Sequence, residues 1–363
     1  MSGSVGNAAV ALEDWTYPVN SNQDIAKITT LPQLNPYYLC VALCCRQGQL
    51  QMQRLPVGSV QQHTFIWQLE KLLIPICSEP FQQEIEKIYK ASQQRLRQSQ
   101  SLYSEAESIL LEELGLKDWQ PPGETIAVKA FSESVGSKGR LDAEYYHPNK
   151  QSILDCLANI PGRTIGEHFT SVNETLNPVQ IKSDELIQNY DLDDALQFFI
   201  NEKESVSALE LGSTKVRFKK NDVIVSRLRS YLKEIALVDT PETANCVGSS
   251  EFIVLRPQSE EVNPELLLVY LRSLPVQVIL KWCQAGSNHP RFMEEDLLSI
   301  KLPEKLIRAQ QQIKQTIRTA IEARRDSKRL LELTKRGVEI AIEQDETAAL
   351  AWMNEQTRQM DLS

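Results

Sequence analysis

The chain has 363 residues, of which 42% are hydrophobic and 24% charged; these values are typical of globular proteins and exclude wholesale disorder. With 14 Gly and 17 Pro, the composition also excludes collagen-like and Pro/Gly-rich low-complexity proteins. No run of about 18 apolar residues occurs, and the first residues show no basic region followed by an apolar stretch. We therefore expect a soluble, cytoplasmic protein with no membrane partner.

The seven cysteines and four histidines form no pattern typical of a metal site or a disulfide framework. The cysteine count is odd, and no two cysteines are spaced as C-x-x-C. We expect buried, reduced thiols, no zinc, and no cofactor bound by this chain.

The net charge of −9 by itself argues against a nucleic-acid partner, because binding to phosphates requires Lys and Arg. The charge is segregated along the chain, however. Residues 215–233 carry a net charge of +6 and residues 305–336 carry +7, whereas residues 183–210 carry −7. The sum over the whole chain hides these two basic segments.

An internal repeat with an offset of 228 residues covers about 30–114 and 258–342. Only the second copy follows a long segment, about 131–256, so the first copy lacks the front half of the unit. The matching pairs are Asn35-Pro36 with Asn263-Pro264, Gly58-Ser59 with Gly286-Ser287, Gln83-Glu84-Ile85 with Gln311-Gln312-Ile313, and, with a slip of about two residues, Ile74-Pro75-Ile76 with Ile300-Lys301-Leu302-Pro303.

Each copy ends in a long helical pattern with a narrow, heptad-like apolar seam. A helix with so narrow a stripe needs a partner of similar length, and the other copy supplies one. We expect an antiparallel coiled coil; the alternative is two surface helices packed separately on their own domains. The predicted helix-pairing residues are Ile85, Tyr89, Leu96, Tyr103 and Leu110 in the first helix and Ile313, Ile317, Leu331 and Val338 in the second.

The region between the helices is predicted to form a compact α+β domain. Residues 216–218, 223–225 and 252–255 have the β-branched and aromatic composition of strands. Asn221-Asp222 is predicted to be a hairpin turn between the first two of these strands. Asn263-Pro264 is a typical helix start, with Asn as the N-cap and Pro at the first helical position.

Two motifs suggest catalysis, and we reject both. Asn35-Pro36-Tyr37-Tyr38 resembles the Asn-Pro-Pro-aromatic motif of adenine methyltransferases, but the chain has no Gly-x-Gly turn to hold a methyl donor. Its repeat partner, which begins at Asn263, lacks the aromatic residues, and a helix start explains both copies. Ser249 and Ser250 have no patterned base, which argues against a hydrolase.

The segment 219–233 combines cations with hydroxyl groups, the side chains that contact DNA phosphates. Arg227 and Arg229 would share one face of an extended strand, and Arg is the commonest reader of guanine. Gly286–Phe292 is predicted to be a polar turn whose amides could meet a phosphate. The alternatives are a solvated strand and an ordinary loop. The DNA-binding candidates are Lys219, Lys220, Ser226, Arg227, Arg229, Ser230, Tyr231, Lys233, Ser249, Ser250, Asn288, His289 and Arg291.

An ordered set of motifs resembles the DNA-specificity (S) subunit of type I restriction-modification systems. A long Gln-rich helix follows the last of these motifs. The motifs are Arg140-Leu141-Asp142-Ala143-Glu144-Tyr145-Tyr146, residues 222–233, Gly248-Ser249-Ser250-Glu251-Phe252, Asn263-Pro264, Gly286-Ser287 and residues 300–303. The resemblance implies one complete target-recognition domain, part of another, and two long helices that pair antiparallel and hold such domains apart.

The resemblance also implies the function and the partners. The chain would be a non-catalytic subunit that recognises double-stranded DNA. Modification subunits using S-adenosylmethionine would methylate adenine N6, and a restriction subunit using ATP and Mg would cleave DNA. Either the chain is truncated, or a second polypeptide supplies the missing part of the first recognition domain.

The resemblance and the breaks in pattern together divide the chain. The expected segments are 1–78, a remnant of the first recognition domain; 79–114, the first long helix; 115–139, a linker; 140–303, the second recognition domain; 304–345, the second long helix; and 346–363, a C-terminal tail. An alternative function is a truncated adaptor that assembles partner proteins through its helices without binding DNA. An enzyme, either a methyltransferase or a nuclease, is a third alternative.

Overall fold

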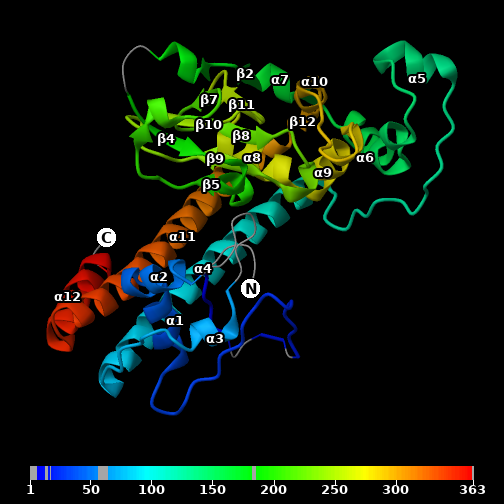
Figure 1. Ribbon diagram of the computed structural model, residues 1–363. Coiled ribbons are helices and arrows are strands. Elements are labelled where there is room, and N and C mark those ends of the chain that lie inside the picture. Colours follow the sequence, from blue (N-terminus) through cyan, green and yellow to red (C-terminus); the bar gives the residue numbers. More distant parts are fainter. Residues whose placement is uncertain (1–5, 13–14, 17, 56–63, 182–184, 362–363) are drawn as a thin grey trace. The chain divides into compact units, whose positions relative to one another are not determined.

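The computed structural model describes residues 6–12, 15–16, 18–55, 64–181 and 185–361, and Figure 1 shows its ribbon. The chain forms two compact units: unit 1 comprises residues 1–100 and 322–363, and unit 2 comprises residues 101–321. The division falls within both predicted long helices rather than at their ends, so each unit contains part of both helices.

The elements mix helices and strands, as expected for the α+β class. The α-helices are α1 (Pro36–Cys44), α2 (Arg46–Gln53), α3 (Ile66–Leu69), α4 (Glu79–Leu114), α5 (Phe131–Lys138), α6 (Pro148–Ala158), α7 (Ile165–His168), α8 (Pro264–Arg272), α9 (Leu274–Cys283), α10 (Glu294–Leu298), α11 (Leu306–Glu343) and α12 (Glu346–Asp361). The strands are β1 (Gly162–Thr164), β2 (Phe169–Val172), β3 (Thr175–Leu176), β4 (Leu186–Tyr190), β5 (Phe199–Ile200), β6 (Val206–Ser207), β7 (Lys215–Phe218), β8 (Val223–Ser226), β9 (Ile235–Val238), β10 (Cys246–Ser249), β11 (Phe252–Pro257) and β12 (Lys301–Pro303).

The predicted repeat is present in the helices. The first residues of α1 and α8 are 228 positions apart, and so are their last residues. The side chains of Asn35 and Asn263 cap these helices, as predicted. The backbone N–H of Asn35 donates to Gln82 Oε1 at 2.7 Å, and that of Asn263 donates to Gln310 Oε1 at 3.1 Å. Gln82 and Gln310 are also 228 positions apart, so the repeat extends to individual hydrogen bonds.

The predicted slip of two residues is wrong. Helix α3 begins at Ile66 and α10 at Glu294, again 228 positions apart, and the residue before each helix donates its backbone N–H to a side chain three positions later. Without the slip, Ile74-Pro75 corresponds to Leu302-Pro303. The match Gly58-Ser59 lies outside the described residues.

In unit 1, the segments of α4 and α11 run in opposite directions, and in unit 2 they share a hydrophobic cluster. In unit 1, Ile85 shares a hydrophobic cluster with Val338, whereas Ser92, further along α4, donates from Oγ to the Ser327 carbonyl oxygen at 2.9 Å. In unit 2, Leu110 lies in a cluster with Ile313. Most predicted seam residues are buried, including Ile85, Leu110, Ile313, Ile317 and Val338. The knob-into-hole packing of a coiled coil stays a prediction.

Three predicted helix-pairing residues, Leu96, Tyr103 and Leu331, are only half-buried. The ring of Tyr103 packs on Phe198, with ring centroids 4.9 Å apart, and the Arg272 guanidinium lies over it. Tyr103 therefore packs against the strand domain.

Unit 2 contains two five-stranded sheets, ordered β3-β7-β10-β4-β6 and β2-β11-β8-β9-β5, and a two-stranded sheet of β1 and β12. The predicted strands 216–218, 223–225 and 252–255 correspond to β7, β8 and β11. The predicted hairpin at Asn221-Asp222 is wrong, because β7 and β8 belong to different sheets. Asp222 is instead buried at the turn, where Arg256 donates to both of its carboxylate oxygens at 2.8 Å.

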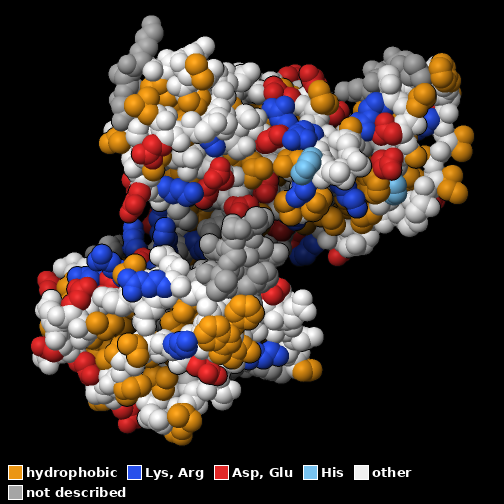
Figure 2. Space-filling view, in the orientation of Figure 1, with side chains coloured by type: hydrophobic (Ala, Val, Ile, Leu, Met, Phe, Trp, Pro, Cys, Tyr) orange, Lys and Arg blue, Asp and Glu red, His pale blue; other side chains and the backbone are white. Residues whose placement is uncertain are grey.

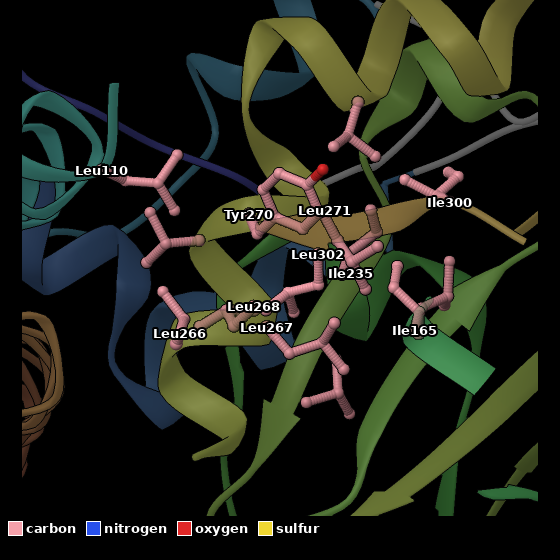
Figure 3. Packing of buried hydrophobic residues seen from close by; sticks show 14 of the residues in the cluster. Leu110, Ile165, Ile235, Leu266, Leu267, Leu268, Tyr270, Leu271, Ile300 and Leu302 are labelled. Carbon is pink, nitrogen blue, oxygen red and sulfur yellow. The ribbon is translucent and has the colours of Figure 1, made fainter. Parts of the chain in front are cut away.

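The central strands β8, β9 and β11 are buried on both faces, which places the core in two layers. Ile224, Val254 and their neighbours face the other sheet, whereas Val223 and Val225 pack against the helices. This alternation follows the two-residue period of a strand. Figure 3 shows the helix-side core, where residues of α4, α7, α8, β9 and β12 meet around Tyr270. The buried Tyr270 hydroxyl donates to the Lys301 carbonyl oxygen at 2.5 Å.

Two segments predicted to be irregular contain helices. The predicted linker 115–139 starts as expected with a left-handed Gly115, which ends α4, but it also contains α5. The predicted C-terminal tail forms α12, which buries Ala349 and Met353 in the core of unit 1. Gly337 of α11 permits this packing, because a Cβ atom there would collide with Met353 Sδ.

Among the described residues, no single helix has the length and apolarity of a membrane span; α8 and α9 meet those criteria only as a pair bent by 66°. None of the seven cysteines, all of which the structure describes, forms a disulfide.

Candidate nucleic-acid interface

The structure divides the predicted basic segment 215–233 into three parts. The first part, on β7, is neutralised by the acidic stretch that precedes it. Lys215 pairs with Asp191 at 3.5 Å, and Arg217 pairs with Glu185 at 2.5 Å. The sequence showed opposite charges in separate segments, and the fold brings part of them together.

The second part is the turn that holds Lys219 and Lys220, at one end of β8. The four residues of β8 span about 13 Å, so these lysines lie well away from Arg227 at its other end. The Lys219 backbone N–H donates to Asp222 Oδ2 at 2.9 Å, and Asn221 adopts a left-handed conformation. The two lysines thus form a site separate from the arginines that follow β8.

The third part, residues 227–233, lies directly beside residues 284–292, although about sixty positions separate them in the sequence. The Arg229 backbone N–H donates to the Pro290 carbonyl oxygen at 2.9 Å, and the Phe292 N–H donates to the Arg227 carbonyl oxygen at 3.2 Å. Isolated bridges join Leu228 and Ala285 to Arg291. We call residues 227–233 and 284–292 the paired loops. Both were predicted separately as DNA-binding segments.

Arg227 and Arg229 do not share a face, contrary to the expectation, because β8 ends at Ser226 and Arg229 is left-handed (φ 49°). The guanidinium of Arg229 reaches across to the other loop, where Nη2 lies 3.3 Å from both the Asn288 carbonyl oxygen and His289 Nδ1. Arg227 is half-buried, and its Nε is buried without a hydrogen-bond partner among the described residues. The alternative of a solvated strand is also wrong, since every residue of β8 is buried.

Arg291 is held by a carboxylate. Its guanidinium donates to both oxygens of Glu251 at distances of 2.6 to 3.1 Å, and to the His289 carbonyl oxygen at 3.1 Å. The hydrogen bond from Arg291 holds the pKa of Glu251 below its usual value. Because its charge is compensated, Arg291 fits a role in positioning the loop better than one in binding phosphate.

The remaining candidates differ in their access to solvent. Ser226 and Ser230 are buried, so their hydroxyls cannot reach a ligand in this conformation. Ser249 and Lys233 are half-buried, and Ser249 Oγ accepts from the Glu251 N–H at 3.3 Å. The exposed candidates in this region are Tyr231, Ser250, Asn288 and His289. On the face shown in Figure 2, Lys and Arg side chains lie among Asp and Glu side chains rather than in one continuous patch.

Two arginines absent from the predicted site fix the ends of the paired loops. Arg140 pairs with Asp142 and donates to the carbonyl oxygens of Cys283 and Gln284 at 2.8 and 3.0 Å, where α9 ends and the second loop begins. Arg272 donates to the Lys233 and Ile235 carbonyl oxygens at 2.7 Å, where the first loop ends. The motif at Arg140 was visible in the sequence, but no local pattern indicated Arg272.

Glu234 lies buried behind the first loop. Burial raises the pKa of its carboxyl group, and Ser226 provides a hydrogen bond that partly opposes this rise. Its Oε2 has no hydrogen-bond partner among the described residues. Among all the residues that the structure describes, no group of three or more His, Cys, Asp or Glu side chains could hold a metal ion.

Comparisons with known proteins give structural neighbours only. No family model and no curated protein matches the sequence. The structure is similar to the S subunit of a type I restriction-modification system from M. genitalium, with 16% identity over 83% of this chain and 70% of that chain and a TM-score of 0.37. The HsdS subunit from Thermoanaerobacter tengcongensis gives 14% identity over 86% and 71% and a TM-score of 0.32. A structure describing complex assembly and conformational transition of the type I R-M system gives 15% identity over 83% and 70% and a TM-score of 0.30.

Proposed function

We propose that the chain is a DNA-specificity subunit of a type I restriction-modification complex and that residues 140–303 read one part of a DNA sequence. One observation carries the proposal. Two segments predicted independently to bind DNA lie side by side, and their main chains are hydrogen-bonded to each other. They present Arg229, Asn288 and His289 together at a single place.

The chemistry of this group suits base edges in the major groove of duplex DNA. An Arg guanidinium matches the O6 and N7 acceptors of guanine, and an Asn amide matches the N6 and N7 of adenine. Tyr231, in the first of the paired loops, and Ser250, between β10 and β11, are exposed. Their hydroxyl groups are suited to contacts with phosphates. Lys219 and Lys220 stay candidates for a separate phosphate contact.

The proposed partners follow from the resemblance of the motifs. Modification subunits with S-adenosylmethionine would methylate adenine, and a restriction subunit with ATP and Mg would cleave DNA. This chain would bring them to a chosen sequence without catalysing either step. The paired segments of α4 and α11 would act as an antiparallel coiled-coil spacer between recognition domains.

The test is selection of a preferred sequence from a pool of random duplexes by the chain assembled with a modification subunit. We expect enrichment of one sequence and a steep loss of affinity with rising salt. Arg229→Ala should weaken binding by about 1–3 kcal/mol and relax the preference at one base pair. Arg329→Ala, which removes an exposed cation on α11 paired with Asp326, is the charge-matched control and should leave the preference unchanged.

Arg229→Lys separates base reading from phosphate contact. Lysine keeps the charge but loses the planar fork, so a base-reading role predicts loss of the preference with retention of the salt dependence. If the pool shows no enrichment, or if Arg229→Ala leaves both affinity and preference unchanged, the proposal is wrong.

The adaptor alternative gains support from three ion pairs. Those of Lys215 and Arg217 neutralise two cations of the basic segment 215–233, and that of Arg291 neutralises a predicted DNA-binding residue. An adaptor would assemble with the modification subunit but enrich no DNA sequence. The same selection therefore separates the two functions. Methyl transfer by the purified chain alone would instead favour an enzyme.

A further inference from the structure

In unit 2, the strand β12 and the helix α10 together form a seat for the segment that begins the recognition domain. Strand β1 pairs antiparallel with β12, and Arg163 lies opposite Leu302. Helix α7 follows β1 directly and packs on α10, where Gly166 lies close to Leu298. Figure 3 shows Ile165, Ile300 and Leu302 in the core that this pairing closes.

The backbone hydrogen bonds of this seat are specific. The Ile165 N–H donates to the Ile300 carbonyl oxygen at 2.9 Å, and the Glu304 N–H donates to the Pro161 carbonyl oxygen at 3.0 Å. Hydrogen-bonded pairs alternate along an antiparallel ladder. Arg163 and Leu302 lie midway between these two bonds, so the backbone N–H of each faces the carbonyl oxygen of the other. The seat thus uses the carbonyl of Ile300, both backbone groups of Leu302 and the N–H of Glu304.

The repeat places the same seat in unit 1, where those backbone groups have no partner among the residues that the structure describes. The positions 228 residues earlier are Leu72, Ile74 and Ile76. In the described part of the chain, no hydrogen bond is made by the Leu72 carbonyl, by either backbone group of Ile74, or by the Ile76 N–H. Residues 72–78 belong to no helix, strand or turn. A segment whose backbone hydrogen-bonding groups are left unpaired can accept another strand.

The side chains around the unit 1 seat are apolar and exposed. Leu73 is 80% exposed, Ile66 69%, Ile76 65% and Trp67 55%. At the four equivalent positions of unit 2, the residues are charged: Lys301, Glu294, Glu304 and Glu295. A seat filled by a covalently attached segment does not need extra apolar contact, whereas one that captures a separate polypeptide does, because association costs translational and rotational freedom.

We propose that residues 64–76 bind a recognition domain on a separate polypeptide through its β-strand and the helical turn that follows. The incoming strand pairs with Ile74, as β1 pairs with Leu302, and the turn covers Ile66 and Trp67. The inference rests on the proposed function, because it takes the partner to be a recognition domain. It assigns residues 64–76 as the surface that binds this partner.

The test uses the full chain and a fluorescent peptide with the sequence of residues 158–172, which contains β1 and α7. We expect saturable binding in fluorescence anisotropy. N-methylation of the peptide at Arg163 removes a donor that faces the seat and should weaken binding roughly three- to tenfold. N-methylation at Gly162, whose N–H faces away in this register, is the matched control and should have little effect.

Variants of the chain test the other side of the interface. Ile76→Pro removes the N–H equivalent to that of Glu304, and it should weaken binding by a similar factor. Ile76→Ala keeps the N–H and should weaken binding less. Because Ile76 is exposed, neither change disturbs the core, and circular dichroism checks that both variants fold.

Three outcomes would overturn the inference. They are a dissociation constant weaker than about 1 mM, binding that neither Arg163 N-methylation nor Ile76→Pro weakens, and self-association of the chain through Ile76 in place of peptide binding. Ile76→Pro should leave the DNA selection that depends on Arg229 unchanged. If the unmodified chain selects a DNA sequence but does not bind the peptide, this inference alone is contradicted. If it binds the peptide but selects no DNA sequence, the proposed function alone is contradicted.

Discussion

Arg318 of α11 joins the long helix to the strand domain within unit 2, and its removal should be costly. Its guanidinium donates to Glu265 Oε1 at 2.5 Å, to Asp239 Oδ1 at 2.6 Å and to Asn221 Oδ1 at 3.2 Å. Glu265 is fully buried, and Asp239 is 9% exposed. Burial alone would lower the pKa of Arg318, but the two carboxylates raise it overall. Arg318→Met therefore removes the guanidinium that these two largely buried carboxylates share.

Breaking a buried ion pair by removing one partner costs about 3–5 kcal/mol. Arg318 is 32% exposed, so water screens part of the interaction, and we expect about 2–3 kcal/mol. Amide hydrogen exchange of α8 and β9 measures this loss within unit 2. Helix α1, the repeat equivalent of α8 in unit 1, is the internal control and should exchange unchanged.

The double variant Arg318→Met with Glu265→Met tests the cause. Replacing both partners by apolar residues removes the unpaired Glu265 carboxylate, so it should be less destabilising than Arg318→Met alone by at least about 1 kcal/mol. A loss below about 1 kcal/mol for Arg318→Met, or additive effects of the two single variants, would refute this account of the contact.

Two further predictions concern the helices and the buried carboxyl group. In a background without native cysteines, Ser92→Cys with Ser327→Cys should form a disulfide, because the two Oγ atoms lie 3.3 Å apart. Ile85→Cys with Ser327→Cys should not, since Ile85 lies about 10 Å before Ser92 along α4. A disulfide in the second variant and none in the first would exclude the antiparallel register. Burial raises the pKa of Glu234 above its unfolded value of about 4.3, so folded unit 2 binds more protons than the unfolded chain and loses stability as the pH rises through that raised pKa. Glu234→Gln should therefore gain stability relative to the wild type as the pH rises above about 4.3 in urea unfolding, whereas a difference independent of pH would contradict the assignment.

The sequence predicted well those features that depend on neighbours in the chain. The caps at Asn35 and Asn263 were predicted because an Asn side chain bonds to amides two or three residues later. Strands β8 and β11 were predicted because β-branched and aromatic residues, which fit a pleated strand, are concentrated there. The repeat was found because the same short motifs, such as the Asn-Pro helix start, recur 228 residues apart.

Features that depend on distant partners could not be predicted. The turn at Asn221-Asp222 has the composition of a hairpin, but the buried ion pair of Asp222 with Arg256 fixes it between two sheets. Arg291 reads as a free cation in the sequence, yet Glu251, forty positions earlier, binds it. Helix α12 was not predicted because few of its residues are apolar and buried. Its packing depends on the contact of Met353 with Gly337 of α11.

The paired loops are fixed in place before any ligand arrives. The left-handed conformation of Arg229 costs about 1 kcal/mol for a residue with a side chain, and it persists because the backbone bonds to Pro290 and Phe292 hold both loops. Arg140 and Arg272 fix the points where these loops leave α9 and approach β9. The entropic cost of ordering the loops is thus met during folding, so DNA binding does not have to offset that cost. A base-reading side chain gains selectivity only where its geometry is fixed, so the unusual conformation of Arg229 fits a reader of bases better than a flexible phosphate contact.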